Sequence, residues 1–205
     1  MSASRHCRRG GRPGRGRAQQ GVTAVEFSIV IVIFLLLVCG VLELARSMYF
    51  FNALQEVTRR AANGATHVDF GDADALDRVR HAALFRQSAG TLLLGEPVSD
   101  LNIRIDYLAV TRAPDGSMSL APIPAGSMPG SPADNRVACM EDPNGASCIR
   151  FVRARICAAT AGDGCTALRY RSAFPFVDLP MSVPIAPTIV SAESLGFVPG
   201  MLPGL

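Results

Sequence analysis

The pattern of hydrophobic and polar positions first separates one apolar run, Phe27 to Ala45, from the rest of the chain. The run has 19 residues, and its one charged side chain is that of Glu43. As an α-helix it would extend about 28 Å, close to the hydrocarbon thickness of a bilayer. We therefore predict one membrane-spanning helix, with Glu43 near its outer end, where a carboxylate reaches the interface at lower cost.

The helical period continues beyond this run. Apolar residues spaced three or four apart share one helix face, namely Phe50, Leu54, Val57, Ala61 and Ala65. One helix from about Val22 to Ala62 would thus be apolar first and amphipathic afterwards. This form is typical of a pilin spine, and a juxtamembrane helix that packs on its own domain is the alternative. The aromatic residues Tyr49–Phe51 are predicted to anchor the helix at the interface.

Shorter elements follow and predict a small α+β domain. A second helix is expected from Ala75 to about Ala89, ended by Gly90. Alternation of apolar positions predicts strands at Leu101–Tyr107 and Ile149–Cys157, and a third at Ala167–Phe174.

Proline and glycine shape the remainder of this domain. Residues 113–135 are rich in Pro, Gly, Ser and Ala and predict a long exposed loop. After residue 174 the prolines allow only edge or irregular strand. The apolar segment Ala186–Leu205 could pack on the domain or dock with a partner subunit, and packing is favoured.

Charge defines the N-terminal part of the chain. No acid precedes residue 22, but six arginines do: Arg5, Arg8, Arg9, Arg12, Arg15 and Arg17. Positive charge beside a membrane helix marks its cytoplasmic side, so the C-terminal domain would be periplasmic. Nucleic-acid binding is not expected, because no aromatic residues for stacking are interleaved with these arginines.

The stretch Gly21–Phe27, GVTAVEF, lies where the basic arm meets the apolar helix, and Glu26 is the fifth residue after Gly21. It resembles the site that prepilin peptidases cut, directly after a glycine, which leaves a glutamate at the fifth position. The resemblance implies cleavage between Gly21 and Val22. Thr23 and Glu26 also fit a capping box, so Glu26 alone does not decide between cap and processing signal.

Further sequence segments extend this resemblance. The segments Gly21–Phe27, Leu42-Glu-Leu-Ala-Arg46, Asn52-Ala-Leu-Gln55 and Arg59-Arg-Ala-Ala62 resemble the start of TadE-like proteins, over about residues 17–66. These are minor pseudopilins of the tight-adherence (Tad, or Flp) pilus machinery. The resemblance implies a role in pilus biogenesis for adhesion or secretion. The implied partners are the inner membrane, a prepilin peptidase, other pilin or pseudopilin subunits, and Tad assembly proteins. Family members often carry a proline near the position of Val32, so a straighter helix is expected here.

The cysteines divide by predicted compartment, with Cys7 inside, Cys39 in the membrane and four outside: Cys139, Cys148, Cys157 and Cys165. An even set in an oxidising space predicts two disulfides. Three pairings are possible, and Cys139–Cys148 with Cys157–Cys165 is favoured because each closes a short loop beside a strand. The spacing lacks the close pairs of most zinc sites.

Together these patterns predict a basic cytoplasmic leader (1–21), a transmembrane helix with its stem (22–66) and an extracytoplasmic α+β domain (67–205). No nucleophile, phosphate loop or metal motif accompanies the histidines, so we expect neither an enzyme nor a cofactor. An uncleaved, single-pass binding or adaptor module of the cell envelope is the alternative to a pseudopilin.

Overall fold

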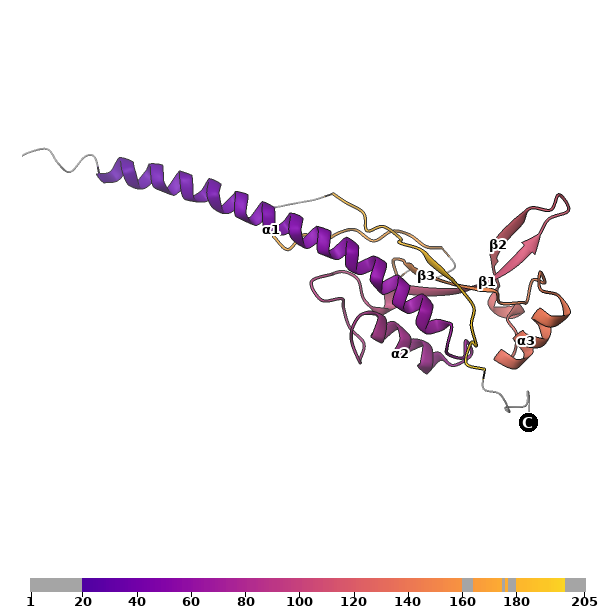
Figure 1. Ribbon diagram of the computed structural model, residues 1–205. Helices are drawn as coiled ribbons and strands as arrows, with labels where there is room; N and C mark the ends of the chain where they lie inside the picture. The colour runs from indigo at the N-terminus through magenta and orange to yellow at the C-terminus, as the bar shows by residue number, and fades with distance from the viewer. Residues whose placement is uncertain (1–19, 160–163, 175, 177–179, 198–205) are drawn as a thin grey trace, which may run out of the picture. The chain divides into compact units, whose positions relative to one another are not determined.

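The computed structural model describes residues 20–159, 164–174, 176 and 180–197. It divides into two compact units, residues 1–42 and 43–205. Helix α1 (Gln20–Ala65) begins in the first unit and ends in the second (Figure 1). The predicted basic leader lies almost entirely outside the described residues, as does Cys7.

The first unit is the apolar part of α1. Its most apolar window of 18 residues has a mean hydropathy of 3.0, and none of that window is buried by the protein. Among the described residues, α1 is the one helix long and apolar enough to cross a membrane. A continuous helix suits that environment because every backbone N–H and C=O is paired within the segment. The predicted long N-terminal helix is therefore present, with bounds at Gln20 and Ala65 instead of Val22 and Ala62, and it suits a membrane anchor.

The second unit is built on a four-stranded antiparallel sheet in the order β2-β1-β3-β4. Its strands are β1 (Ile103–Arg112), β2 (Met118–Pro122), β3 (Phe151–Ile156) and β4 (Thr188–Ser191). β3 pairs with the first half of β1, Ile103 to Leu108, and β2 pairs with the second half, Leu108 to Arg112. The α+β prediction is confirmed.

The second half of α1 packs on one face of this sheet. All five residues of the predicted apolar face are fully buried (Phe50, Leu54, Val57, Ala61 and Ala65). They form clusters with apolar side chains of β1 and β3, among them Ile103, Ala154 and Ile156. This half of α1 is thus a helix packed on its own domain, as one of the two alternatives predicted.

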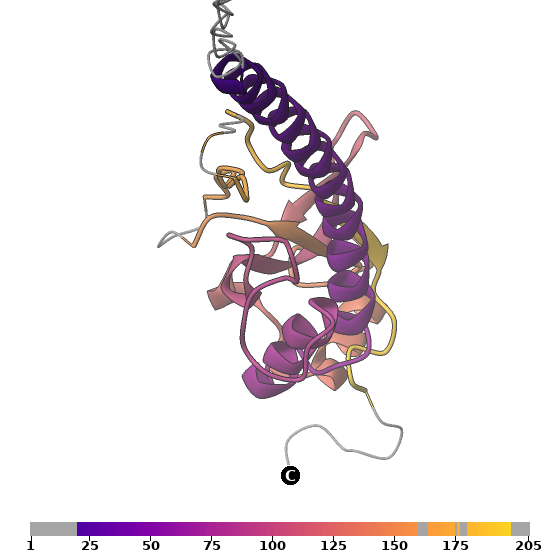
Figure 2. The same ribbon diagram turned by 90° about the vertical axis from the view of Figure 1, so that its left-hand side faces the viewer.

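Helix α2 (Ala73–Ala83) lies beside the end of α1, and Figure 2 shows the two helices together on one side of the domain. A Cβ on Gly64 would lie only 2.9 Å from a methyl carbon of Val79, so the glycine permits this close approach. Asp72 caps α2 by accepting a hydrogen bond from the N–H of Ala75. α2 ends at Ala83 and not near Ala89 as predicted, because the backbone leaves the helical conformation at Leu84 and Phe85, where φ is +60°.

Two predictions for the remaining chain are wrong. The predicted loop 113–135 contains strand β2 and the start of α3 (Pro132–Glu141). The Pro-Asp-Gly turn at 114–116 folds β2 back onto β1. Residues 167–174 form no strand where described, and only an isolated bridge joins Arg169 to Ser182.

The C-terminal segment behaves as predicted for residues up to 197. β4 is an edge strand that pairs with β3. Beyond it, Leu195 is buried, and its N–H donates to the carbonyl of Thr66 at the end of α1. The described part of this segment therefore packs on its own domain.

Candidate functional site

The predicted processing segment lies at the start of α1. The helix already begins at Gln20, and the side chains of Val22 and Glu26 are exposed. Thr23 lies three residues after the first residue of the helix. The assignment of a helix end varies by only one or two residues, so Thr23 is inside the helix. An N-cap has non-helical backbone, so the predicted capping box is wrong for the chain with its arm attached. Glu26 therefore has no capping role in this structure.

A polar cluster is buried where the apolar part of α1 ends. The Glu43 side chain is only 1% exposed. Its carboxylate accepts hydrogen bonds from the Tyr170 hydroxyl (2.7 Å), the backbone N–H of Ala173 (3.0 Å) and Arg46 Nη1 (3.1 Å). The domain itself surrounds this carboxylate, and the prediction that Glu43 lies near the membrane interface stays a prediction. Charge-assisted bonds of this kind satisfy a buried carboxylate, which would otherwise be costly to desolvate.

Arg46 extends this cluster to two loops of the domain. It donates to the carbonyls of Leu94 (3.0 Å) and Arg171 (2.9 Å), and to the Tyr170 hydroxyl (3.2 Å). One turn of α1 thus fixes segments 48 and 125 residues further along the chain. The cluster attaches the helix to the domain at the first residues of the second unit.

Tyr170 also completes an aromatic group with Phe50 and Phe51, whose ring centroids lie 5.4 and 6.3 Å from its own. The predicted interfacial anchor is therefore wrong for Phe50, which is fully buried in the domain, whereas Phe51 is half-buried and Tyr49 is exposed. Burial, and then the hydrogen bond to Glu43, raise the pKa of Tyr170 to about 12. The phenol consequently stays protonated as the donor to Glu43.

The exposed face of the α1 stem carries a small ion-pair group. Glu56 accepts from Arg59 Nη2 at 2.9 Å and from Arg60 Nε at 2.7 Å. These hydrogen bonds lower the pKa of Glu56 below its usual value. The group is solvated and contributes little to stability.

The disulfides join Cys139 to Cys148 and Cys157 to Cys165, the pairing that the sequence favoured. The first ties α3 to the segment before β3, and the second closes a loop directly after β3. Cys39 on α1 is the free cysteine of the described residues and is half-buried.

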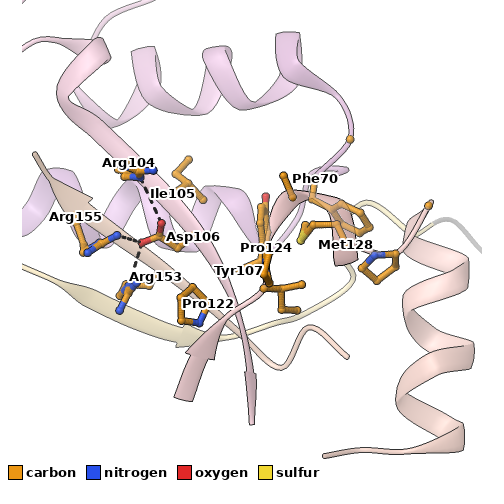
Figure 3. Close-up of a pocket in the computed structure, with 15 residues that line it drawn as sticks. Phe70, Arg104, Ile105, Asp106, Tyr107, Pro122, Pro124, Met128, Arg153 and Arg155 are labelled. Atoms are coloured by element: carbon orange, nitrogen blue, oxygen red, sulfur yellow. Dashed lines mark hydrogen bonds and ion pairs between the residues drawn. The ribbon is translucent and has the colours of Figure 1, made fainter. Parts of the chain in front are cut away.

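An open groove of about 750 Å³ runs along β1 (Figure 3). At one end three arginines meet one carboxylate: Arg155 Nη2, Arg153 Nε and Arg104 Nε lie 2.7, 3.0 and 3.6 Å from oxygens of Asp106. Phe70, Tyr107 and Met128 line the other end. The alternation Arg-x-Asp in β1 and Arg-x-Arg in β3 was the sequence signal for this charged sheet face, and sequence reasoning missed it.

No arrangement typical of catalysis accompanies these sites. His81 Nε2 lies 3.6 Å from a carboxylate oxygen of Asp100, and both side chains are half-buried. Within the described ranges, no three His, Cys, Asp or Glu side chains are close enough together to hold a metal ion. The groove holds a charge cluster and apolar residues, without a paired nucleophile and base.

These features define a class of protein with one N-terminal apolar helix that suits a membrane anchor and a small α+β domain. Within this class, residues 21–63 match the family model described as TadE-like protein, which confirms the resemblance for that segment. This family comprises structural components of pili and not enzymes. No curated protein and no solved structure matches the chain.

The matched segment is about a fifth of the chain and coincides with α1. It includes Gly21, Val22 and Glu26, together with the buried pair Glu43 and Arg46. The combination fits a membrane protein related to the Tad pilus. The groove, the disulfides and Tyr170 lie outside the match.

Proposed function

We propose that this protein is a minor pseudopilin of the TadE kind, which a prepilin peptidase cuts between Gly21 and Val22. The observation that carries this proposal is the family match over residues 21–63, because it begins at the glycine and includes Glu26. The exposure of Val22 and Glu26 on α1 supports access of the peptidase to this segment. The start of α1 at Gln20 disfavours the capping explanation of Glu26 in the chain with its arm attached, and so supports the processing signal.

The proposed setting is the inner membrane, with the basic arm in the cytoplasm and the disulfide-bonded domain in the periplasm. The arginines before residue 22 support this orientation, and the two disulfides support an oxidising compartment. The proposed partners are a prepilin peptidase, pilin or pseudopilin subunits and Tad assembly proteins, for adhesion or secretion.

The packing of α1 limits how such a subunit would contact its neighbours. The apolar face of the stem is occupied by the protein's own sheet, whereas the apolar side chains of Val22–Leu42 are largely free of protein contacts. Helix-to-helix contacts in an assembly would therefore use residues 22–42. The carboxylate of Glu26 would pair with the new amino terminus of a neighbour, since an unpaired charge in lipid is costly.

The experiment is co-expression with a prepilin peptidase, followed by separation of the membrane fraction on a denaturing gel. The wild-type chain should lose its 21-residue leader, and Gly21→Asp should retain it. Gly40→Ala is the matched control, because a Cβ at Gly40 meets nothing within 4 Å and cleavage should continue. Equal migration of wild type and Gly21→Asp would contradict the proposal.

The second candidate, an uncleaved single-pass adaptor of the cell envelope, is favoured by one observation. The α1 stem packs on its own domain, as a juxtamembrane helix does. The adaptor would keep its leader in cells that contain an active prepilin peptidase, and Glu26→Ala would leave its behaviour unchanged.

A further inference from the structure

The first half of β1 has one open edge. β2 pairs only with Leu108–Arg112, and the last contact beyond it is the N–H of Ile123 donating to the carbonyl of Tyr107 (2.9 Å). Pro124 follows, and Ala125–Ser127 form a short 3-10 helix, so this chain leaves the ladder before it reaches Ile105. No strand of the described residues pairs with the edge of Ile103–Tyr107 that faces away from β3.

The ladder shows which backbone groups lie on this edge. The carbonyls of Asn102 and Leu108 accept from residues beside β3, and that of Tyr107 accepts from Ile123 on the β2 side. In an antiparallel sheet the backbone groups of successive residues alternate in direction. The N–H and C=O of Ile105 therefore face the groove, in position to bond an added strand.

The charged end of the groove has a surplus of positive charge. Arg153 and Arg155 both lie against one carboxylate, that of Asp106, and their side chains are 21% and 17% exposed. Arg104 reaches the same carboxylate and also donates to the carbonyl of Gly164 (3.2 Å). A carboxylate carries one negative charge and cannot occupy all the donors of two guanidinium groups. Arg155 Nε is buried and has no hydrogen-bond partner among the described residues. A second carboxylate would neutralise part of this surplus and supply acceptors.

The two faces of the edge differ in chemistry. Arg104 and Asp106 project from one face of β1, and Ile105 and Tyr107 from the other, because side chains alternate along a strand. Phe70 packs edge-on against Tyr107 with ring centroids 5.7 Å apart, and Met128 lines the same apolar end. An added strand would thus have alternate side chains beside arginines and beside apolar groups.

We propose that this groove binds an extended segment of a partner protein in which acidic and apolar residues alternate, by adding it as a strand to β1 at Arg104–Tyr107. The unpaired N–H and C=O of Ile105 would bond the backbone of an added polypeptide strand, and the positively charged arginines would bind the carboxylates of that strand. This interaction surface is separate from the Gly21 site and does not depend on whether the leader is removed.

The test uses the full chain in detergent micelles and a fluorescently labelled probe peptide, Val-Asp-Val-Asp-Val, with blocked termini. Binding is followed by fluorescence anisotropy. Arg155→Gln and Arg153→Gln should each weaken binding about tenfold, the loss expected for one charge-assisted hydrogen bond. Arg112→Gln is the matched control, because Arg112 lies on β1 outside the groove and is exposed. Raising the salt from about 0.1 M to about 1 M should also weaken binding, as the Debye length shortens from about 10 to about 3 Å.

Two further peptides separate strand addition from simple anion binding. Val-Asn-Val-Asn-Val should bind at least about tenfold more weakly. N-methylation of the residues that face β1 should abolish binding, whereas methylation of the alternate residues should not. The proposal is overturned by an absence of peptide binding or by equal effects of Arg112→Gln and Arg155→Gln. It is also overturned if both methylated peptides bind like the parent while inorganic phosphate displaces them, because the groove is then a small-anion site. Self-association that the arginine variants abolish, without peptide binding, would assign the groove to a second copy of the chain.

Discussion

At the residue scale, the buried carboxylate of Glu43 carries much of the attachment between α1 and its domain. It replaces its lost hydration with three hydrogen bonds, and one donor, Tyr170, comes from 127 residues further along the chain. Arg46 adds bonds to two backbone carbonyls. A single helical turn thus joins two distant segments, at Leu94 and at Tyr170–Ala173, around one charge.

Glu43→Ala should therefore destabilise the domain by about 3 kcal/mol. Removing one member of a buried ion pair leaves the other uncompensated, and Arg46 is only 16% exposed. Urea unfolding of the detergent-solubilised chain measures the change. Glu56→Ala is the control on the same helix, because its ion pairs are solvated and the midpoint should barely move. Equal midpoints for the two variants would contradict the role assigned to Glu43.

Tyr170 should titrate well above an ordinary phenol. Its pKa of about 12 in the fold, against 10.0 for the free group, means that folding favours the protonated form. The contribution to stability is complete below pH 10 and is lost as pH rises from about 10 to about 12. The difference in absorbance at 295 nm between wild type and Tyr170→Phe should show a midpoint near 12, and near 10 in urea. A midpoint near 10 in the folded protein would disprove the buried bond.

At the scale of elements, the C-terminal segment closes over the end of α1. Gly196 has φ of +82°, and a Cβ there would lie 2.5 Å from the backbone nitrogen of Asp69. Leu195, beside it, is buried and bonds the carbonyl of Thr66. The close approach of two backbones, and not only the turn, requires glycine at this position.

Gly196→Ala should accordingly destabilise the domain more than Gly116→Ala does. Both glycines have positive φ, +82° and +84°, but a Cβ on Gly116 would meet nothing within 4 Å. The backbone strain common to both is about 1 kcal/mol, and the clash at Gly196 should add about 1–3 kcal/mol. Thermal unfolding of the two variants gives the comparison. A smaller loss for Gly196→Ala than for Gly116→Ala would mean that the segment does not pack as described.

The elements also show which features a sequence can predict. Helix geometry fixes which side chains share a face, so the spacing of Phe50, Leu54 and Val57 predicted their burial correctly. Strand pairing depends on which edges are open. The alternation at 167–174 therefore misled, and the edge of β3 is taken by β4. Composition obscured β2, although the Pro-Asp-Gly turn before it is a hairpin signal.

Contacts between distant segments limit how much of the candidate sites the sequence can predict. The cysteine pairing was predictable because each loop is short. The Glu43–Tyr170 bond was not, since no local pattern links residues so far apart. The arginine groove depends on the register of β1 against β3, which places Arg104 opposite Arg155 and Asp106 opposite Arg153. The Gly21–Glu26 segment was recognisable from family resemblance, and its processing stays a prediction.

At the scale of the whole molecule, an arginine-rich arm precedes an apolar helix and a disulfide-bonded domain whose sheet packs against the amphipathic stem, and our proposal is that a peptidase removes the arm. A pseudopilin needs the first two for processing and assembly, and the third presents surfaces such as the β1 groove. The fate of the arm distinguishes a pseudopilin from a permanent adaptor, because only a processed pseudopilin loses the arm.

The mass of the intact protein, isolated from membranes of cells with an active prepilin peptidase, tests this account most directly. The account predicts a chain that begins at Val22, with the mass of residues 22–205 less four hydrogens for the two disulfides. Sequencing of the N-terminal peptide would identify Val22 independently. A mature protein that retains residues 1–21 would contradict the account and favour the uncleaved adaptor.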